Sequence, residues 1–188
     1  MRRIFGAIQD LLEKKDKIIV AIDGKSASGK TTLADFVHSK IDCNVFRMDD
    51  FCLTDEQRET KPYGCVNVDV ARFYNEVVNN LQKDSPFDYD KFNFKENVYH
   101  KIVVVEQKPV NIVEGVYSCC DQLKDCYDLK IFLNIDDVEQ KIRLANMDNF
   151  EQQQEFLEWE KTYFEKQSPQ EDADIVCTSA SLFLTENF

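Results

Sequence analysis

The fold of this chain is decided by the eight residues Gly24-Lys25-Ser26-Ala27-Ser28-Gly29-Lys30-Thr31, which match the phosphate-binding loop pattern G-x-x-x-x-G-K-[ST] at every position. They follow the apolar run at 18–22 and precede a stretch with helical spacing, so the loop joins a strand to a helix. The chain has 5 glycines in 188 residues, and two of them stand in this loop. The pattern in this context predicts that the chain binds a nucleoside triphosphate.

The residue types of the loop fit the chemistry of phosphate binding. Glycine at 24 and 29 lets backbone N–H groups approach phosphate oxygens without an intervening side chain. The helix that we expect to begin at about Lys30 adds free N–H groups and the positive end of its dipole. Lys30 is expected to reach the outer phosphates of ATP, and the Thr31 hydroxyl to bind Mg²⁺. The predicted nucleotide site consists of Gly24, Lys25, Ser26, Ala27, Ser28, Gly29, Lys30, Thr31 and Thr32.

Composition excludes several other classes of protein. The formal net charge of −12 argues against a general nucleic-acid binder, because a phosphate backbone needs a basic surface. No apolar stretch approaches the ~20 residues of a membrane helix, so we expect no membrane partner and a cytoplasmic location. The seven cysteines show no C-x-x-C spacing, which leaves zinc and redox motifs without support. At 188 residues, the chain is expected to form a single domain spanning 1–188, and a homo-oligomer stays open.

Hydrophobic spacing predicts an alternation of strands and helices. The segment 53–67 is polar and is expected to be a loop, and the aromatic, charged segment 87–99 has no clear period. Alternating strands and helices predict an α/β fold with a mostly parallel central sheet, and the phosphate-loop motif within it indicates the three-layer P-loop NTPase fold. Strands are expected at 17–22, 44–48, 102–105, 110–113, 129–135 and 174–178, and helices at 3–15, 32–40, 68–81, 136–149 and around 156–164.

Acidic residues follow two of the predicted strands. Asp49 and Asp50 end the second strand, and Glu114 ends the strand at 110–113. Ligands of open parallel sheets lie beyond the carboxyl ends of the strands, where these residues and the phosphate loop should meet. Asp49 or Asp50 could accept the proton of an attacking hydroxyl, and Glu114 could hold Mg²⁺ or its water. A solvated carboxylate that caps a loop or helix is the simpler interpretation of each residue taken alone.

Further motifs, in order, resemble the uridine kinase-like family of P-loop kinases, which also includes phosphoribulokinase and bacterial-type pantothenate kinase relatives. The resemblance spans about residues 17–178. The phosphate loop specifies only the superfamily, whereas the M-D-D-F and V-E-G-V-Y-S segments are more specific to this branch. The matching stretches are 21–32, Phe46-Arg47-Met48-Asp49-Asp50-Phe51, Asn67-Val68-Asp69 with Arg72-Phe73, Val113-Glu114-Gly115-Val116-Tyr117-Ser118 and 127–133.

The resemblance implies an ATP- and Mg²⁺-dependent kinase for a small-molecule alcohol, with a nucleoside as the leading acceptor. It implies that Asp49 is the general base and that Asp69 hydrogen-bonds acceptor hydroxyls. Glu114 corresponds to the magnesium-associated acid. Phe92 and Phe94 fall near an aromatic pair that flanks the acceptor, and Arg143 corresponds to a lid arginine that meets the charge of the transferring phosphate. For Arg143, a solvated helix residue is an equally good interpretation.

The chain departs from the family pattern around the lid and the acceptor. Ala145 stands where many relatives carry a second lid arginine, and the lid, which we expect at about 143–155, is several residues short. Phe92-Asn93 replaces a Tyr-Asp pair, so the acceptor could differ from a nucleoside. Two alternatives therefore stay open: a kinase for a vitamin precursor or sugar derivative, and a degenerate protein that binds nucleotide without catalysis. The choice between ATP and GTP is also open.

Overall fold

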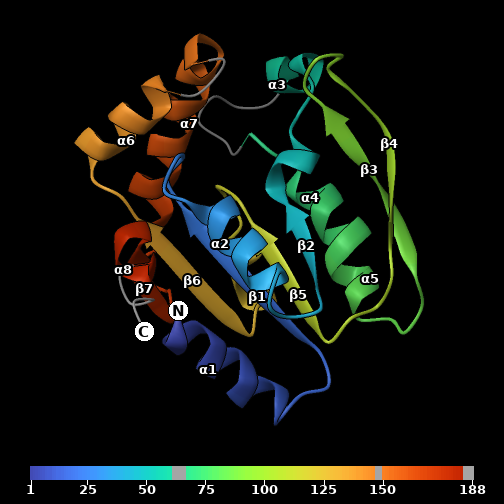
Figure 1. Cartoon of the computed structure of the whole chain (residues 1–188). Coiled ribbons are helices and arrows are strands. Elements are labelled where there is room, and N and C mark those ends of the chain that lie inside the picture. The colour runs from blue at the N-terminus through green and yellow to red at the C-terminus, as the bar shows by residue number, and fades with distance from the viewer. Residues whose placement is uncertain (61–66, 147–149, 184–188) are drawn as a thin grey trace.

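A computed structural model of the chain describes residues 1–60, 67–146 and 150–183 and has a sheet of five parallel strands at its centre (Figure 1). The strand order is β2-β5-β1-β6-β7, and β3 and β4 form a separate antiparallel hairpin. The predicted α/β fold with a parallel sheet is confirmed. The elements are α1 (Arg2–Leu12), β1 (Ile18–Gly24), α2 (Lys30–His38), β2 (Cys43–Arg47), the 3-10 turn η1 (Met48–Phe51), α3 (Asp55–Thr60), α4 (Val70–Phe73), the π-helical turn η2 (Tyr74–Val78), α5 (Asn79–Leu81), β3 (Phe87–Asn93), β4 (Val98–Val105), β5 (Val110–Glu114), the 3-10 turn η3 (Lys124–Cys126), β6 (Leu129–Asn134), α6 (Asp137–Ala145), α7 (Phe150–Gln167), β7 (Ile175–Thr178) and α8 (Ser179–Phe183).

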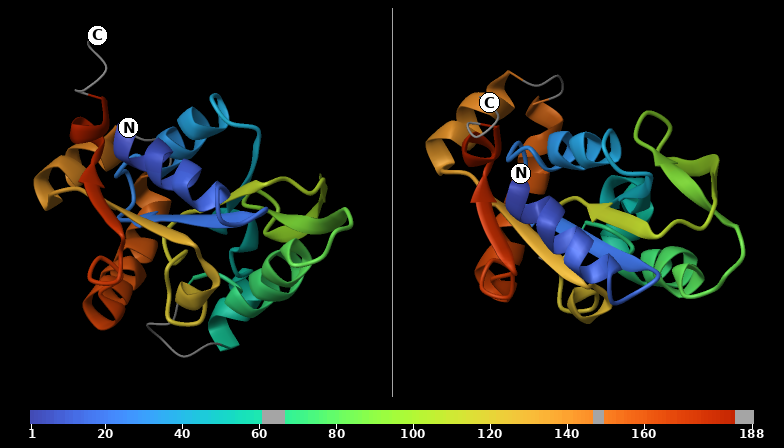
Figure 2. Two further views of the ribbon diagram at one scale, coloured as in Figure 1. Left: turned by 90° about the horizontal axis from the view of Figure 1, so that it is seen from below. Right: turned by 60° about the horizontal axis from the view of Figure 1, so that its bottom comes forward.

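The central strands are buried on both faces, which explains their nearly continuous apolar sequences. In β1, Ile18, Val20 and Ile22 pack on one face, whereas Ile19 contacts the core on the other. Helices α1 and α2 cover the first face, and α7 together with the helix formed by α4, η2 and α5 covers the second (Figure 2). These are the three layers that the alternating pattern predicts.

The strand register brings the carboxyl ends of the central strands together. In the parallel pairs of the sheet, Ile22 of β1 lies beside Glu114 of β5, and Glu114 lies beside Arg47 of β2. The phosphate loop follows β1, and η1, with Asp49 and Asp50, follows β2. One edge of the sheet therefore collects the residues that the sequence placed at strand ends.

Two segments differ from the sequence prediction. Residues 55–60 form the short helix α3 within the stretch 53–67 that was expected to be a loop, and positions 61–66 lie outside the described residues. The segment 87–99 contains β3 and the start of β4, which pair as a hairpin. Ile102 and Val104 of β4 are apolar and yet exposed. The apolar residues of this segment therefore do not mark a buried face, and the sequence lacks the alternation typical of a half-buried strand.

The predicted lid at 143–155 spans the end of α6 and the start of α7. Residues 147–149 of this segment lie outside the described part of the chain, and no side chain from 150 to 155 is described. The expected helix 136–149 ends at Ala145 as α6, and the aromatic helix predicted around 156–164 is the longer α7. None of the helices in the described ranges combines the length and apolar character needed to cross a membrane.

Candidate active site

The phosphate loop joins β1 to α2, as its sequence predicted, and its shape depends on glycine. Gly24 has a φ of +139°, and a Cβ there would lie 2.2 Å from the carbonyl oxygen of Leu133. Gly29 has a φ of +100° and precedes the first turn of α2. These two positions need a residue without a side chain, so the loop can curve beneath the free N–H groups of the helix.

A buried carboxylate supports the loop from below. Asp23 accepts hydrogen bonds from the Gly24 N–H at 2.6 Å, the Cys119 N–H at 2.8 Å and the Tyr163 hydroxyl at 2.6 Å. Burial raises the pKa of Asp23 to about 6, although these donors and the Lys30 charge favour the ionised form. Asp23 thereby links the phosphate loop to α7 and to the segment after β5.

The side chains of the predicted nucleotide-binding residues point in different directions. Lys30 is buried, and its Nζ donates to the carbonyl oxygens of Gly24 at 2.8 Å and Lys25 at 2.9 Å. The Lys25 side chain instead pairs with Asp137 at 2.6 Å. The Ser28 hydroxyl is buried without a partner among the described residues, and Thr32 is exposed.

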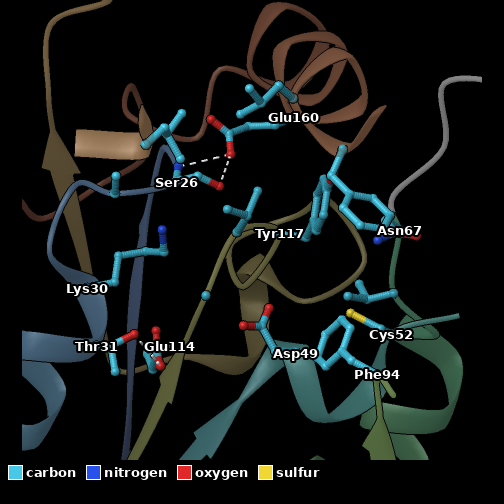
Figure 3. A pocket seen from close by; sticks show the side chains of 17 residues that line it. Ser26, Lys30, Thr31, Asp49, Cys52, Asn67, Phe94, Glu114, Tyr117 and Glu160 are labelled. Carbon is cyan, nitrogen blue, oxygen red and sulfur yellow. Dashed lines mark hydrogen bonds between the residues drawn. The ribbon is translucent and has the colours of Figure 1, made fainter. Parts of the chain in front are cut away.

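A cavity of about 470 Å³ opens beside the loop (Figure 3). In the view of Figure 3, Lys30 and Thr31 lie on one side and Phe94 and Cys52 on the other, with Asp49 between them. The cavity thus has a polar end at the phosphate loop and a more apolar end beyond it. Its lining consists of Ser26, Ala27, Lys30, Thr31, Asp49, Cys52, Asn67, Val68, Phe94, Glu114, Gly115, Val116, Tyr117, Leu144, Phe156, Leu157 and Glu160.

Thr31 and Glu114 form the position that fits Mg²⁺. The Thr31 hydroxyl donates to Glu114 Oε1 at 3.0 Å, and the Arg47 Nε lies 3.3 Å from the same oxygen. Desolvation raises the pKa of Glu114, and Lys30 acts in the opposite direction. Oxygen ligands of this kind suit Mg²⁺, which commonly takes one or two protein ligands and completes its shell with phosphates and water. The described ranges contain no group of three or more His, Cys, Asp or Glu residues that could hold a metal ion.

The two neighbouring aspartates of η1 have different surroundings. Asp49 is exposed to the open cavity, yet the protein around it removes part of the hydration of the carboxylate and raises its pKa, while Lys30 lowers it. Asp50 is buried and accepts from the Tyr89 hydroxyl at 3.0 Å, and Lys91 Nζ lies 2.7 Å from its other oxygen. Asp49 is therefore the one that faces the cavity, and Asp50 fastens the β3–β4 hairpin to η1. Its raised pKa makes Asp49 a better proton acceptor than an ordinary solvated aspartate.

The residues predicted for acceptor binding are divided. Phe94 lines the cavity and is 59% exposed, whereas Phe92 is buried in the core, with the two ring centroids 5.0 Å apart. Asp69 does not line the cavity; its side chain accepts from the Arg72 N–H at 3.0 Å and caps α4. Phe92 and Asp69 could contact an acceptor in the cavity, as predicted, only if these side chains moved from their positions in this structure.

Arg143 of α6 reaches the phosphate loop without lining the cavity. Its Nη1 donates to the Ala27 carbonyl oxygen at 3.0 Å, its Nη2 to the Ser179 hydroxyl at 3.0 Å, and its Nε to Glu139 at 2.9 Å. The guanidinium therefore lies against the outer side of the loop, near the phosphates that the loop is expected to hold.

Sequence reasoning missed several residues of the cavity, including Asn67, Tyr117 and Glu160. Tyr117 has a φ of +75°, which is unusual for a residue other than glycine, and it lines the cavity. Glu160 comes from α7 and contacts Ser26, 134 positions away. Tyr117 lies within the V-E-G-V-Y-S segment, which could have indicated it, whereas Glu160 had no such signal.

No family model matches the chain. A uridine kinase of Ureaplasma parvum serovar 3 is 25% identical over 166 residues, with 80% of each chain covered. A uridine kinase of Streptococcus gordonii is 30% identical over 141 residues, with 70% of this chain and 67% of the relative covered. A solved structure described as a possible uridine kinase from Bacillus stearothermophilus has a TM-score of 0.67 at 20% identity, covering 93% of this chain and 98% of that one.

The solved structure agrees with the fold, and each curated relative covers 70% or more of this chain. By identity and coverage of its relatives, this chain belongs to the uridine kinase-like family of P-loop kinases.

Proposed function

We propose that the protein transfers the γ-phosphoryl group of MgATP to a hydroxyl group of a small molecule, with a nucleoside as the leading acceptor. One observation carries the proposal: a single cavity joins Lys30 and Thr31 of the phosphate loop to the carboxylate of Asp49. A kinase needs these groups together, because phosphoryl transfer depends on positioned phosphates, a metal and a group that takes the acceptor's proton.

The polar end of the cavity would hold the nucleotide. Backbone N–H groups of the loop and of the first turn of α2 would bind the phosphates, and Lys30 would exchange its carbonyl partners for phosphate oxygens. Thr31 and Glu114 would hold Mg²⁺, which neutralises charge on the transferring group. Arg143 could turn from the Ala27 carbonyl toward the same phosphates.

Asp49 would act on the acceptor. As the acceptor's hydroxyl oxygen attacks the γ-phosphorus and the bond to the leaving ADP oxygen breaks, the hydroxyl proton passes to Asp49. General bases of this kind contribute about 10²–10⁴-fold to rate. Desolvation raises the pKa of Asp49, so the carboxylate binds the hydroxyl proton more strongly and is a more effective general base.

The far end of the cavity suits an acceptor with an apolar or planar part. Phe94, Tyr117 and Phe156 contribute aromatic rings, and Val68 and Cys52 add apolar surface. A nucleoside base can pack on such rings, and the relatives named above are uridine kinases, which supports a nucleoside. Small-molecule chemistry driven by MgATP also fits our prediction of a cytoplasmic protein.

A panel of acceptors tests the proposal. Purified protein with MgATP or MgGTP is given nucleosides, pantothenate-like alcohols and sugar alcohols, and ADP or GDP formation is followed by a coupled assay. We expect uridine or cytidine to accelerate ADP formation well above the acceptor-free rate. Acceleration by a different alcohol alone would replace the nucleoside as acceptor. No acceleration by any member would favour the degenerate, nucleotide-binding alternative.

A further inference from the structure

A carboxylate occupies hydrogen-bond donors of the phosphate loop. Glu160 Oε2 accepts from the Ser26 N–H at 2.9 Å and from the Ser26 hydroxyl at 2.5 Å, as the dashed lines of Figure 3 show. A phosphate oxygen would use the same donors, because backbone N–H groups of the loop are what bind phosphates in this motif. In this structure, an internal anion therefore holds part of the predicted anion site.

The surroundings of Glu160 suit a replaceable anion. The residue is 4% exposed, and no lysine or arginine forms an ion pair with it within the described ranges. Its second carboxylate oxygen accepts from Gln140 Nε2 at 2.9 Å, and Gln140 also donates to the Ser26 carbonyl oxygen at 3.2 Å. Hydrogen bonds and, among the described residues, no ion pair therefore hold the carboxylate on Ser26, so a phosphate that accepts from the same donors can replace it without breaking an ion pair.

The position of Glu160 points to the outer phosphate. Ser26 and Glu160 both line the cavity that contains Asp49, the proposed base. In the proposed function, the γ-phosphate must lie between the loop and that base. The inner phosphates, by contrast, would bind nearer to the first turn of α2. Glu160 is thus on the side of the loop where the terminal phosphate arrives.

We propose that Glu160 is a positioning residue that stands in for the γ-phosphate in the nucleotide-free protein and leaves Ser26 when ATP binds. Until then, it keeps the Ser26 N–H and hydroxyl in the arrangement that the phosphate uses. This inference rests on the proposed function. Helix α7 carries Glu160 and also contributes Phe156 and Leu157 to the cavity, so the exchange would link nucleotide binding to the acceptor end.

The substitution Glu160→Gln tests the exchange. It removes the charge that competes with and repels the phosphate, while keeping the size of the side chain. Since hydrogen bonds to a charged group are stronger than neutral ones, we expect MgATP to bind about tenfold tighter by calorimetry. MgADP, which lacks the γ-phosphate, should change by less than about twofold. Glu158→Gln, an exposed position of the same helix, is the matched control and should change neither affinity.

Each other outcome is decisive. Unchanged or weaker MgATP binding by the Glu160→Gln variant would overturn the inference and make Glu160 a structural or ligand-binding group. Equal tightening of MgADP and MgATP would overturn its assignment to the terminal phosphate. If wild type and variant both fail to bind nucleotide, the proposed function falls as well, which separates the two failures.

A second test uses the wild-type protein alone, so it does not depend on whether the Glu160→Gln variant folds. Trp159 is the single tryptophan of the chain, is buried and directly precedes Glu160. We expect its fluorescence to change when MgATP binds and to stay nearly constant with MgADP. Binding of MgATP by calorimetry with no change in Trp159 emission would contradict the departure of Glu160.

Discussion

Thr31 and Glu114 are 83 positions apart in the chain, yet the Thr31 hydroxyl donates a hydrogen bond of 3.0 Å to the Glu114 carboxylate. The parallel pairing of β1 with β5 creates this contact, since it aligns Ile22 with Glu114 just before the phosphate loop begins. A hydroxyl and a carboxylate that meet at the carboxyl edge of the sheet offer the oxygen ligands that Mg²⁺ prefers, which is the role we propose for this pair.

The Thr31–Glu114 pair predicts that Glu114→Gln disrupts metal use. We expect kcat to fall by about 10²–10³-fold and the Mg²⁺ concentration for half-maximal rate to rise, because a neutral amide is the poorer ligand. Steady-state kinetics over a Mg²⁺ titration measures both. Asp42→Asn, at an exposed carboxylate paired with Lys108, is the control and should leave both values unchanged. A wild-type Mg²⁺ response in the Glu114→Gln protein would remove Glu114 from the metal site.

The environments of the two aspartates predict different consequences of mutation. Asp49→Asn should lower kcat by about 10³-fold while MgATP affinity stays close to normal, because it removes the general base. Asp50→Asn should mainly lower the free energy of unfolding, because Asp50 binds Tyr89 and Lys91 of the hairpin. Kinetics, calorimetry and urea unfolding separate the effects. Undiminished turnover by the Asp49→Asn protein would end its assignment as base.

The pKa of Asp49 gives the rate a pH dependence. Only the ionised carboxylate can take a proton, so kcat should rise with pH as Asp49 deprotonates. Because desolvation raises its pKa, the inflection should lie above the ordinary value of 3.8. A pH profile of kcat at saturating MgATP measures it. A rate that falls as pH rises through this range would contradict a carboxylate base.

The parts of the site that a local sequence motif defines could be predicted, whereas the parts that depend on contacts between distant segments could not. The loop and Glu114 were predictable because a local motif and strand ends define them. Strand ends alone left Asp49 and Asp50 equivalent, and only the family resemblance selected Asp49. The physical difference between them depends on Tyr89 and Lys91 of a hairpin whose exposed, charged strands have little periodicity. The parallel sheet was predictable because strands buried on both faces are apolar throughout.

Other parts of the site depend on long-range packing. Glu160 reaches Ser26 only because α7 packs across the sheet, where Tyr163 bonds to Asp23. No local pattern encodes that contact. Asp69, predicted to bind the acceptor, caps α4 in this structure, a use of aspartate that a single sequence cannot distinguish from ligand binding.

The two kinds of glycine predict opposite effects on stability. Gly24→Ala places a Cβ 2.2 Å from the Leu133 carbonyl oxygen at a φ of +139°, so it should lower the free energy of unfolding by more than about 2 kcal/mol. Gly6 lies in α1 with nothing within 4 Å of a Cβ, so Gly6→Ala should raise it by about 0.5–1 kcal/mol. Urea unfolding with unchanged m-values is the measurement. A change in the free energy of unfolding that has the same sign in both variants would argue against the described conformation of the loop.

The buried Asp23 predicts that stability decreases as pH rises. Its pKa is about 6 in the folded protein and 3.8 in the unfolded chain, so the folded state holds a proton that the unfolded state has lost. Between these values, wild type should lose up to about 3 kcal/mol relative to Asp23→Asn. Urea unfolding of both proteins from pH 4 to 7 tests this. If the free energies of unfolding of the two proteins changed with pH in parallel, Asp23 would not titrate as described.

The central claim is that the loop at Gly24–Thr31 binds a magnesium-complexed triphosphate. Isothermal titration calorimetry of purified protein with MgATP and MgGTP tests it directly. We predict saturable binding of at least one of them with a dissociation constant on the order of 1 μM to 1 mM, and loss of that binding in Lys30→Ala. Absence of binding heat for both nucleotides over that range would contradict the account.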